Sequence, residues 1–322
     1  MTTDEWQDWW SKFLQERKLL GTIQDLDEAD RLNGHEALTE TICFTVYQHY
    51  DEIKKDLENI KNDLVNMLGG LAQVHLQSGR VKEKDSLIEK VIRKRYEYIG
   101  SKTSAYAHLR GDNYAEIITD LVGVKLIINY RGKWLDIHRE IIERFPLKDR
   151  KEYEAVDHLT HVQGENFLAE IPKAYYAKGD PIEQYRLEGL ESKEHRQGYR
   201  SIHYVISYQM HYVELQVRTI YDEAWSDCDH NYVYKHGAKP NNRALQKLSA
   251  ILCQLTNVAN DIGDNMHDIY EEERFSETDG NAWKATKADI NFFMKAVDRL
   301  KEVQKQLETF TEQLTEDDEA AK

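Results

Sequence analysis

The stretch GYRSIH, from Gly198 to His203, packs several chemically useful side chains into six positions. It holds a glycine, an aromatic ring, a cation, a hydroxyl group and an imidazole. A glycine allows the backbone to turn tightly, and the polar groups around it suit a clamp for a charged ligand. The alternative interpretation is a polar loop without a ligand.

Carboxylates occur at the start of one apolar run and inside another. Asp120 opens the run DLVGVKLIINY, and Glu214 lies in YVELQVR. Successive side chains of a strand point to opposite faces. Glu214, Gln216 and Arg218 therefore lie on one face of the strand, and the apolar residues between them lie on the opposite face. If the two strands are neighbours, Asp120 and Glu214 can share a divalent cation, and their oxygens suit Mg²⁺. The alternatives are an Asp120 that only caps a turn and a Glu214 on the solvent side of an edge strand.

A cluster of cations precedes these runs, and it comprises Arg80, Lys82, Lys90 and Arg93. Ser86 and Glu89 have the spacing of a capping box, so we expect a helix to begin there, with Ser86, Lys90 and Arg93 on one face. With the positive end of the helix dipole, these cations form a cradle for a polyphosphate. An equally supported alternative is a simple cap followed by a solvated face. Lys125, inside the first apolar run, needs solvent or an anionic partner.

The elements that must position these residues follow from hydrophobic periodicity. Apolar residues at helical spacing predict helices near the N-terminus, over 53–67, over 248–262 and over 290–307, whereas 120–130, 203–209 and 212–218 are typical of strands. Met210 and His211 mark a tight turn between the last two strands. We therefore expect an α/β (α+β) fold with a mixed sheet flanked by helices. The expected organisation is a helical region over 1–72, a catalytic domain over 73–238 and a helical region over 239–322 with a disordered acidic tail.

Charge, hydropathy and cysteine content argue against several classes of function. The net charge of −15 argues against a broad nucleic-acid surface, although it leaves room for a local basic pocket. The sequence has no apolar run long enough to cross a bilayer, and its acidic, aromatic beginning is unlike a signal peptide. Three distant cysteines fit neither a zinc site nor a disulfide framework, so we expect a cytoplasmic protein without a membrane partner.

Five segments, taken in order, resemble the RelA/SpoT synthetase domain, the (p)ppGpp synthetase family. They are GRVKEKDSLIEK, DLVGVKL, GYRSIH, ELQVRT and WSDCDHNYVYK. The resemblance implies a nucleotidyltransferase-like fold and transfer of the β,γ-pyrophosphate of ATP to the ribose 3′-hydroxyl of GDP or GTP, with Mg²⁺ as cofactor. Such a reaction needs charge neutralisation and alignment more than covalent help.

The resemblance also implies roles for individual residues. Asp120 and Glu214 would be catalytic and would bind the metal. ATP would be held by Arg80, Lys82, Ser86, Lys90, Arg93 and Lys125. The acceptor would be held by Tyr199, which would stack on its base, and by His203, Gln216 and Arg196.

The chain departs from the family pattern in ways that bear on the acceptor. Lys125 stands where an arginine usually stacks on adenine, His195 and Arg196 replace a lysine, and a long insertion separates Pro146 from His195. One alternative is therefore a toxic relative that modifies the 3′ end of tRNA or makes adenosine alarmones. Its N- and C-terminal helices would contact tRNA or an antitoxin, and the triplet from Arg93 to Arg95 would contact the tRNA backbone. In either case the terminal helices could also join copies of the chain into a homo-oligomer. Another alternative is a nucleotide sensor without activity.

Overall fold

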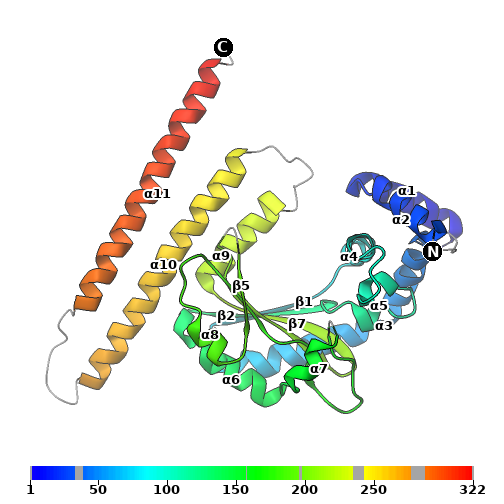
Figure 1. The fold of residues 1–322 in the computed structure, drawn as a ribbon, viewed down its shortest axis with the longest axis horizontal. Helices are drawn as coiled ribbons and strands as arrows, with labels where there is room; N and C mark the ends of the chain where they lie inside the picture. The colour runs from blue at the N-terminus through cyan, green and yellow to red at the C-terminus, as the bar shows by residue number, and fades with distance from the viewer. Residues whose placement is uncertain are drawn as a thin grey trace.

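The structure is a computed structural model that describes residues 2–32, 39–156, 158–195, 198–234, 243–276 and 287–320. A mixed β-sheet lies at its centre, flanked by helices and extended by helices at both ends, which confirms the predicted fold class (Figure 1). Within the described ranges, none of the helices has both the length and the hydropathy that crossing a membrane requires.

The sheet has the strand order β1-β2-β7-β6-β4-β5, and β3 pairs with β6 outside this path. The strands are β1 (Leu76–Val81), β2 (Val122–Ile128), β3 (Phe167–Leu168), β4 (Lys173–Tyr176), β5 (Glu191–Glu194), β6 (Ser201–Tyr208) and β7 (His211–Thr219). β2 runs parallel to β7 with Gly123 opposite Glu214, whereas β1 and β6 are antiparallel to their neighbours β2 and β7. The strand that follows Asp120 and the strand that carries Glu214 are therefore direct neighbours.

The predicted hairpin of β6 and β7 is confirmed, with Gln209 and Met210 as its two turn residues. Both have positive φ angles, 49° and 64°, which are the signs that a type I′ turn requires. This turn sets the register in which His203 lies opposite Gln216 and Val205 lies opposite Glu214.

One face of the sheet is apolar and belongs to the main core. Its central side chains on β7 are fully buried or nearly so, and they are Val213, Leu215 and Val217. Helix α3 (Thr39–Gly69) and helix α6 (Trp134–Arg144) lie beneath the sheet in Figure 1, and α3 contributes Leu57, Ile60 and Leu64 to the same core. Burying each such side chain stabilises the fold by about 1.5–3 kcal/mol. Since the apolar side chains of β7 all point into this core, its polar side chains lie on the opposite face.

The N-terminal helices α1 (Thr3–Arg17) and α2 (Leu20–Leu32) pack against α3 and α4 (Lys84–Glu97). The predicted aromatic helix is α1, whose Trp6, Trp10 and Phe13 are buried. Arg95 of α4 is also buried, and its guanidinium donates hydrogen bonds to Asp30 of α2 and Thr39 of α3, at 3.1 and 2.8 Å. This buried ion pair fixes the position of α4.

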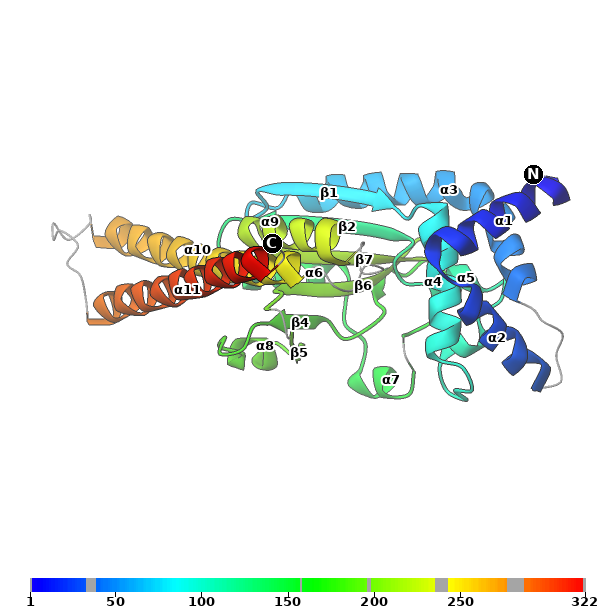
Figure 2. The same ribbon diagram turned by 90° about the horizontal axis from the view of Figure 1, so that it is seen from above.

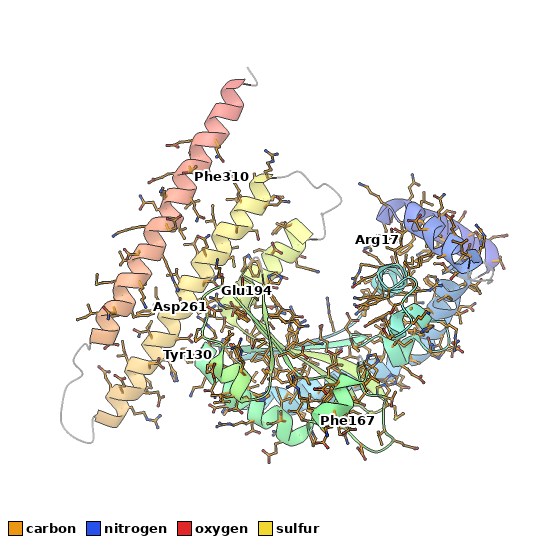
Figure 3. The ribbon with its side chains drawn as sticks, in the orientation of Figure 1. Arg17, Tyr130, Phe167, Glu194, Asp261 and Phe310 are labelled. Atoms are coloured by element: carbon orange, nitrogen blue, oxygen red, sulfur yellow. The ribbon has the colours of Figure 1, made fainter. Side chains whose placement is uncertain are left out.

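The C-terminal region forms a long antiparallel hairpin of α10 (Arg243–Ser276) and α11 (Lys287–Ala320) beside α9 (Ile220–Asp229) (Figures 1 and 2). Trp225 of α9 donates a hydrogen bond to the carbonyl of Ser249 in α10 at 3.0 Å. Asp261, labelled in Figure 3, pairs with Arg131 at the junction of α10 and the sheet domain. The acidic segment from Thr315, predicted to be disordered, continues α11 as far as Ala320.

Shorter elements complete the described chain. They are η1 (Ala105–His108), α5 (Tyr114–Ile117), η2 (Arg131–Lys133), α7 (Arg150–Glu154), α8 (Glu183–Leu187) and the π-helical turn η3 (His230–Tyr234).

Two features differ from the sequence predictions. Helix α4 begins at Lys84 after Glu83, and no side chain caps it, so the predicted capping box of Ser86 and Glu89 is wrong. The segment between Pro146 and His195, interpreted as an insertion, supplies β3, β4 and β5 to the sheet.

Candidate active site

The polar face of the sheet, opposite the core, brings together residues from β1, β2 and β7. A cavity of about 120 Å³ lies over these strands and is lined by Ser78, Arg80, Lys125, Glu214 and Gln216, among others. Arg80 faces this cavity from β1, which is antiparallel to β2 with Arg80 opposite Gly123. A side chain at Gly123 would touch Arg80, since an added Cβ atom would lie 3.6 Å from its Nε atom.

Asp120 lies between two lysines at the head of β2. The Nζ atom of Lys82 is 3.0 Å from Oδ2 of Asp120, and the Nζ atom of Lys90 is 2.8 Å from Oδ1. The backbone amide of Lys82 donates a hydrogen bond to the carbonyl of Leu121, which holds the end of β1 against β2. All three charged side chains are less than one-fifth exposed, so these ion pairs are shielded from water. Asp120 therefore has charged partners in the structure, which speaks against the alternative that it only caps a turn.

Glu214 is held by polar neighbours on β6 and β7. Gln216 donates a hydrogen bond from Nε2 to Glu214 at 2.9 Å, and Nδ1 of His203 lies 3.6 Å from the carboxylate. Burial raises the pKa of Glu214, but the hydrogen bond and charge of His203, the charge of Lys90 and the hydrogen bond of Gln216 outweigh it and lower the pKa to about 2. Glu214 is thus a carboxylate at neutral pH, and Lys90 acts electrostatically on both acids.

Tyr199 lies beside His203, with its hydroxyl group 2.9 Å from the Nε2 atom of that histidine. Gly198 adopts a φ of +82°, a left-handed conformation that favours glycine, so the predicted tight turn is confirmed. The guanidinium of Arg218 lies over the Tyr199 ring, 5.3 Å from its centroid. Tyr175 of β4 meets the same ring edge-on at 5.8 Å. Tyr199 therefore occupies a fixed position at the border of the polar face.

A chain of polar contacts joins the tyrosine side of the site to Lys125. Nζ of Lys125 donates a hydrogen bond to Glu223 of α9 at 2.6 Å, and Glu223 also pairs with Arg218 at 3.2 Å. Sequence reasoning places Arg218 on the polar face but does not include Arg218, Glu223 or Tyr175 in the site. The anionic partner that Lys125 needs is therefore a glutamate distant in the sequence.

The remaining predicted site residues either lie away from the cluster around Asp120 or fall outside the described residues. Ser86 is an exposed residue inside α4, and Arg93 is half exposed and pairs with Glu97 at 3.7 Å, so neither joins the cluster around Asp120. Arg196 lies outside the described residues. The triplet from Arg93 to Arg95 does not form one basic surface, because Arg95 is buried against Asp30.

The donor atoms present fit a magnesium ion that is completed by substrate. Among the described residues, no group of three or more histidines, cysteines, aspartates or glutamates could hold a metal ion. Mg²⁺ in nucleotide sites, however, uses one or two carboxylates and takes its other ligands from phosphates and water. The Oδ1 atom of Asp120 is buried and lacks an aligned hydrogen-bond donor, although Lys90 is close. This oxygen is the carboxylate ligand that Asp120 would offer to Mg²⁺, and in the structure the Lys90 ammonium lies next to it.

Comparison with known proteins assigns the chain by sequence. Residues 79–239 match the model of the region found in RelA / SpoT proteins. No curated protein matches the chain.

Solved structures overlap the chain only partially. A GTP pyrophosphokinase family protein from Streptococcus pneumoniae has 15% identity and a TM-score of 0.42, covering 76% of this chain and 98% of its own. The small alarmone synthetase 1 from Bacillus subtilis has 15% identity and a TM-score of 0.44, covering 70% and 97%. The same synthetase bound to its product pppGpp has 19% identity and a TM-score of 0.44, covering 70% and 96%.

Proposed function

Because the chain belongs to the RelA/SpoT family, we propose that it is an ATP-dependent pyrophosphokinase that transfers the β,γ-pyrophosphate of ATP to the 3′-hydroxyl group of GDP or GTP. The observation that carries the proposal is the cluster of Asp120, Lys82 and Lys90 at the start of β2, the strand that pairs with the Glu214 strand β7. Pyrophosphoryl transfer depends on neutralising phosphate charge and on aligning the reacting groups. Two cations, one just after β1 and one on α4, and two carboxylates, one just before β2 and one on β7, provide for both requirements.

In this proposal, Lys82, Lys90 and Arg80 bind the triphosphate of ATP. The side chains of Lys82 and Lys90 already converge on one point, because Asp120 pairs with both. Asp120 and Glu214 would hold Mg²⁺, which when bound neutralises part of the phosphate charge. The acceptor hydroxyl releases its proton to water, its oxygen forms a bond to the β-phosphorus, the bond from that phosphorus to the α-phosphate oxygen breaks, and AMP leaves.

The low pKa of Glu214 bears on its role. A general base works best when its pKa is near the working pH, and a carboxylate with a pKa of about 2 holds a proton weakly. Glu214 is therefore better suited to holding positive charge and orienting the acceptor hydroxyl than to storing its proton. Lys90, which pairs with Asp120, is also one of the charges that keep Glu214 ionised.

The acceptor nucleotide is proposed to bind beside Tyr199, His203 and Gln216. Arg218 covers one side of the Tyr199 ring, so the acceptor base would stack on the other side. Such a stack is worth about 1–3 kcal/mol, which is enough to place a base but not to distinguish guanine from adenine. His203, between Tyr199 and Glu214, would link acceptor placement to the carboxylate.

The test is transfer of label from γ-labelled ATP with Mg²⁺ to a panel of acceptors comprising GDP, GTP, ADP, ATP and bulk tRNA. We expect labelled guanine nucleotides from the wild type and a loss of at least about 100-fold in Glu214→Gln. Asp112→Asn is the control, since Asp112 is exposed and pairs only with nearby Arg110 at 3.3 Å. Label in tRNA or adenine nucleotides alone would favour the toxic alternative, and no label in any acceptor would contradict enzymatic activity.

A further inference from the structure

The inserted segment, residues 147–194, reaches the acceptor side of the candidate active site. Its strand β4 pairs antiparallel with β6, with Tyr175 opposite Ser201. The turn that follows β4 therefore lies beside the residues that precede β6. An added Cβ atom at Gly198 would lie 3.7 Å from the Cβ atom of Ala177, so the two segments are in close contact.

The turn after β4 is built around Asp180. Its Oδ2 atom accepts a hydrogen bond from the backbone amide of Ala177 at 2.8 Å, and the backbone amide of Asp180 donates one to the Ala177 carbonyl at 3.0 Å. Gly179, between them, has a φ of +91°, a left-handed conformation that favours glycine. The Asp180 carboxylate is thus fixed relative to the backbone of its own turn.

The Asp180 carboxylate also binds Arg200, which lies between Tyr199 and Ser201 in the chain. The Nε atom of Arg200 donates a hydrogen bond to Oδ2 and its Nη2 atom donates one to Oδ1, both at 2.6 Å. Two parallel hydrogen bonds to one carboxylate fix the orientation of a guanidinium as well as its distance. The side chains of Arg200 and Asp180 are only 8% and 13% exposed, so salt screens the pair little.

A second cation holds Asp180 and connects it to helix α10. The Nη1 atom of Arg131 lies 3.8 Å from Oδ1 of Asp180, and Arg131 also pairs with Asp261 and Asp264 of α10. Burial raises the pKa of Asp180, but the hydrogen bond and charge of Arg200, with smaller contributions from a backbone amide and from Arg131, outweigh it and lower the pKa. Asp180 is therefore a carboxylate at neutral pH.

Arg200 is placed to orient its neighbours and not to bind a nucleotide. The residue is 7% exposed, and its Nη1 atom is buried as well. The hydroxyl group of Tyr199 reaches His203 on the polar face of the sheet, whereas the side chain of Arg200 reaches Asp180 in the turn of the inserted segment. Successive side chains of an extended chain point in opposite directions. A fixed Arg200 therefore fixes the direction of the Tyr199 ring.

The position of a stacking ring matters most before its ligand arrives. An aromatic side chain that must be ordered during binding loses part of the stacking energy to conformational entropy. Gly198, directly before Tyr199, is the residue type with the greatest backbone freedom. Arg200, directly after Tyr199, is held by a buried ion pair and supplies the rigid side of the clamp.

We propose that Asp180 is a positioning residue for the acceptor nucleotide: through Arg200 it holds the Tyr199 ring in the orientation in which the acceptor base stacks on it. The inserted segment is then part of the acceptor site, although neither Asp180 nor Arg200 touches the nucleotide. This inference rests on the proposed function, because it takes a guanine nucleotide as the ligand of Tyr199. The competing explanation is an ion pair that only stabilises the fold.

The test compares Asp180→Asn with the wild type in steady-state transfer from ATP to GDP. We expect the KM for GDP to rise about tenfold, within the factor of about 5 to 150 that a base stack is worth, with changes below about threefold in kcat and in the KM for ATP. Asp30→Asn is the matched control, since the Asp30 side chain is 16% exposed and accepts hydrogen bonds from Arg95 at 3.1 and 3.2 Å. It should lower the melting temperature comparably without a selective effect on GDP.

Hydrogen exchange without any nucleotide separates this inference from the proposed function. In Asp180→Asn, the amides of residues 198–200 should exchange at least about tenfold faster while those of β7 are unchanged, and Asp30→Asn should not have this effect. A wild type that labels no acceptor would contradict the proposed function, and the exchange result would still decide whether Asp180 positions Tyr199.

Two results would overturn the inference. One is a folded Asp180→Asn whose KM for GDP and exchange over 198–200 both match the wild type. The other is a loss of stability, ATP binding and GDP binding in the same proportion as in Asp30→Asn, which would make the ion pair purely structural. If Asp180→Asn does not fold, Arg200→Lys decides, because lysine keeps the charge and lacks the fork. It should raise the KM for GDP by at least about threefold, and an unchanged KM would contradict the inference.

Discussion

Replacing Asp120 with asparagine should separate nucleotide binding from catalysis. In the structure, the Asp120 carboxylate forms ion pairs with the Nζ atoms of Lys82 and Lys90, at 3.0 and 2.8 Å. A triphosphate that uses the same two ammonium groups must compete with this carboxylate. Asp120→Asn keeps the shape of the side chain and removes its charge, so the lysines become free for ATP. We therefore expect tighter ATP binding together with loss of transfer.

The size of the effect follows from the contacts. Both lysine contacts of Asp120 are ion pairs of little-exposed side chains, and ATP has to displace the carboxylate from them in the wild type. If only about 1.4 kcal/mol of this competition is relieved, the dissociation constant of ATP in EDTA falls about tenfold. With Mg²⁺ present the direction should reverse, because Asp120 then supplies a ligand to the cation that accompanies ATP. Transfer should fall by at least about 100-fold.

The assay is calorimetric titration of ATP in EDTA and in Mg²⁺, together with the labelled transfer reaction. Asp112→Asn serves as the control, because that aspartate is 76% exposed and distant in sequence from the lysines. ATP binding in EDTA that is unchanged or weaker in Asp120→Asn would refute the reasoning, since it would show that ATP does not meet Lys82 and Lys90.

Three further predictions concern stability and the acceptor side. Arg95→Ala should lower the free energy of unfolding by about 3–5 kcal/mol in urea titrations, because it removes a buried guanidinium that pairs with Asp30 and donates a hydrogen bond to Thr39; a loss below about 1 kcal/mol would contradict a buried ion pair. The pKa of Glu214 in the folded protein, about 2, lies below the ordinary value of 4.5, so its ionisation stabilises the protein above pH 4.5 and this contribution is lost as the pH falls through 2. Glu214→Gln should therefore flatten the dependence of the free energy of unfolding on pH between these values, and an unchanged slope would count against the low pKa. Tyr199→Phe should weaken acceptor binding by no more than about tenfold, since it removes one hydrogen bond to His203. Tyr199→Ala should weaken acceptor binding by about 5- to 150-fold, the loss of a stack worth about 1–3 kcal/mol, and spare ATP; equal loss of both ligands and of melting temperature would make Tyr199 purely structural.

The parts of the fold that the sequence predicts well are those with strong local periodicity. β2, β6 and β7 are runs of β-branched and aromatic residues, and their core side chains are almost completely buried. The neighbouring strand β1 was missed because five of its six residues are exposed and show no alternation. It becomes a strand only because β2 offers an edge for antiparallel pairing. Arg80 therefore approaches the site from a strand and not from the turn before a helix.

The site shows the same division between local and long-range information. Glu214 can be proposed from strand alternation and Asp120 from its place before an apolar run, and the expectation that their two strands are neighbours is confirmed. The partner of Lys125, however, is Glu223, which lies 98 positions away, and that pairing depends on how α9 docks on the sheet. The sequence does not predict Tyr175 as a site residue, because β4 has only four residues and lies in a segment that resembles an insertion. Short strands without periodicity carry little sequence signal.

The central claim is that the chain moves an intact β,γ-pyrophosphate group, and the most direct measurement is the product balance with doubly labelled ATP. ATP labelled in the adenine ring and at the γ-phosphate is incubated with Mg²⁺ and either GDP or GTP, and the nucleotide products are separated. We expect one AMP for every labelled guanine nucleotide, and loss of both products in Glu214→Gln. Formation of ADP in place of AMP, or of AMP without a labelled acceptor, would contradict pyrophosphate transfer.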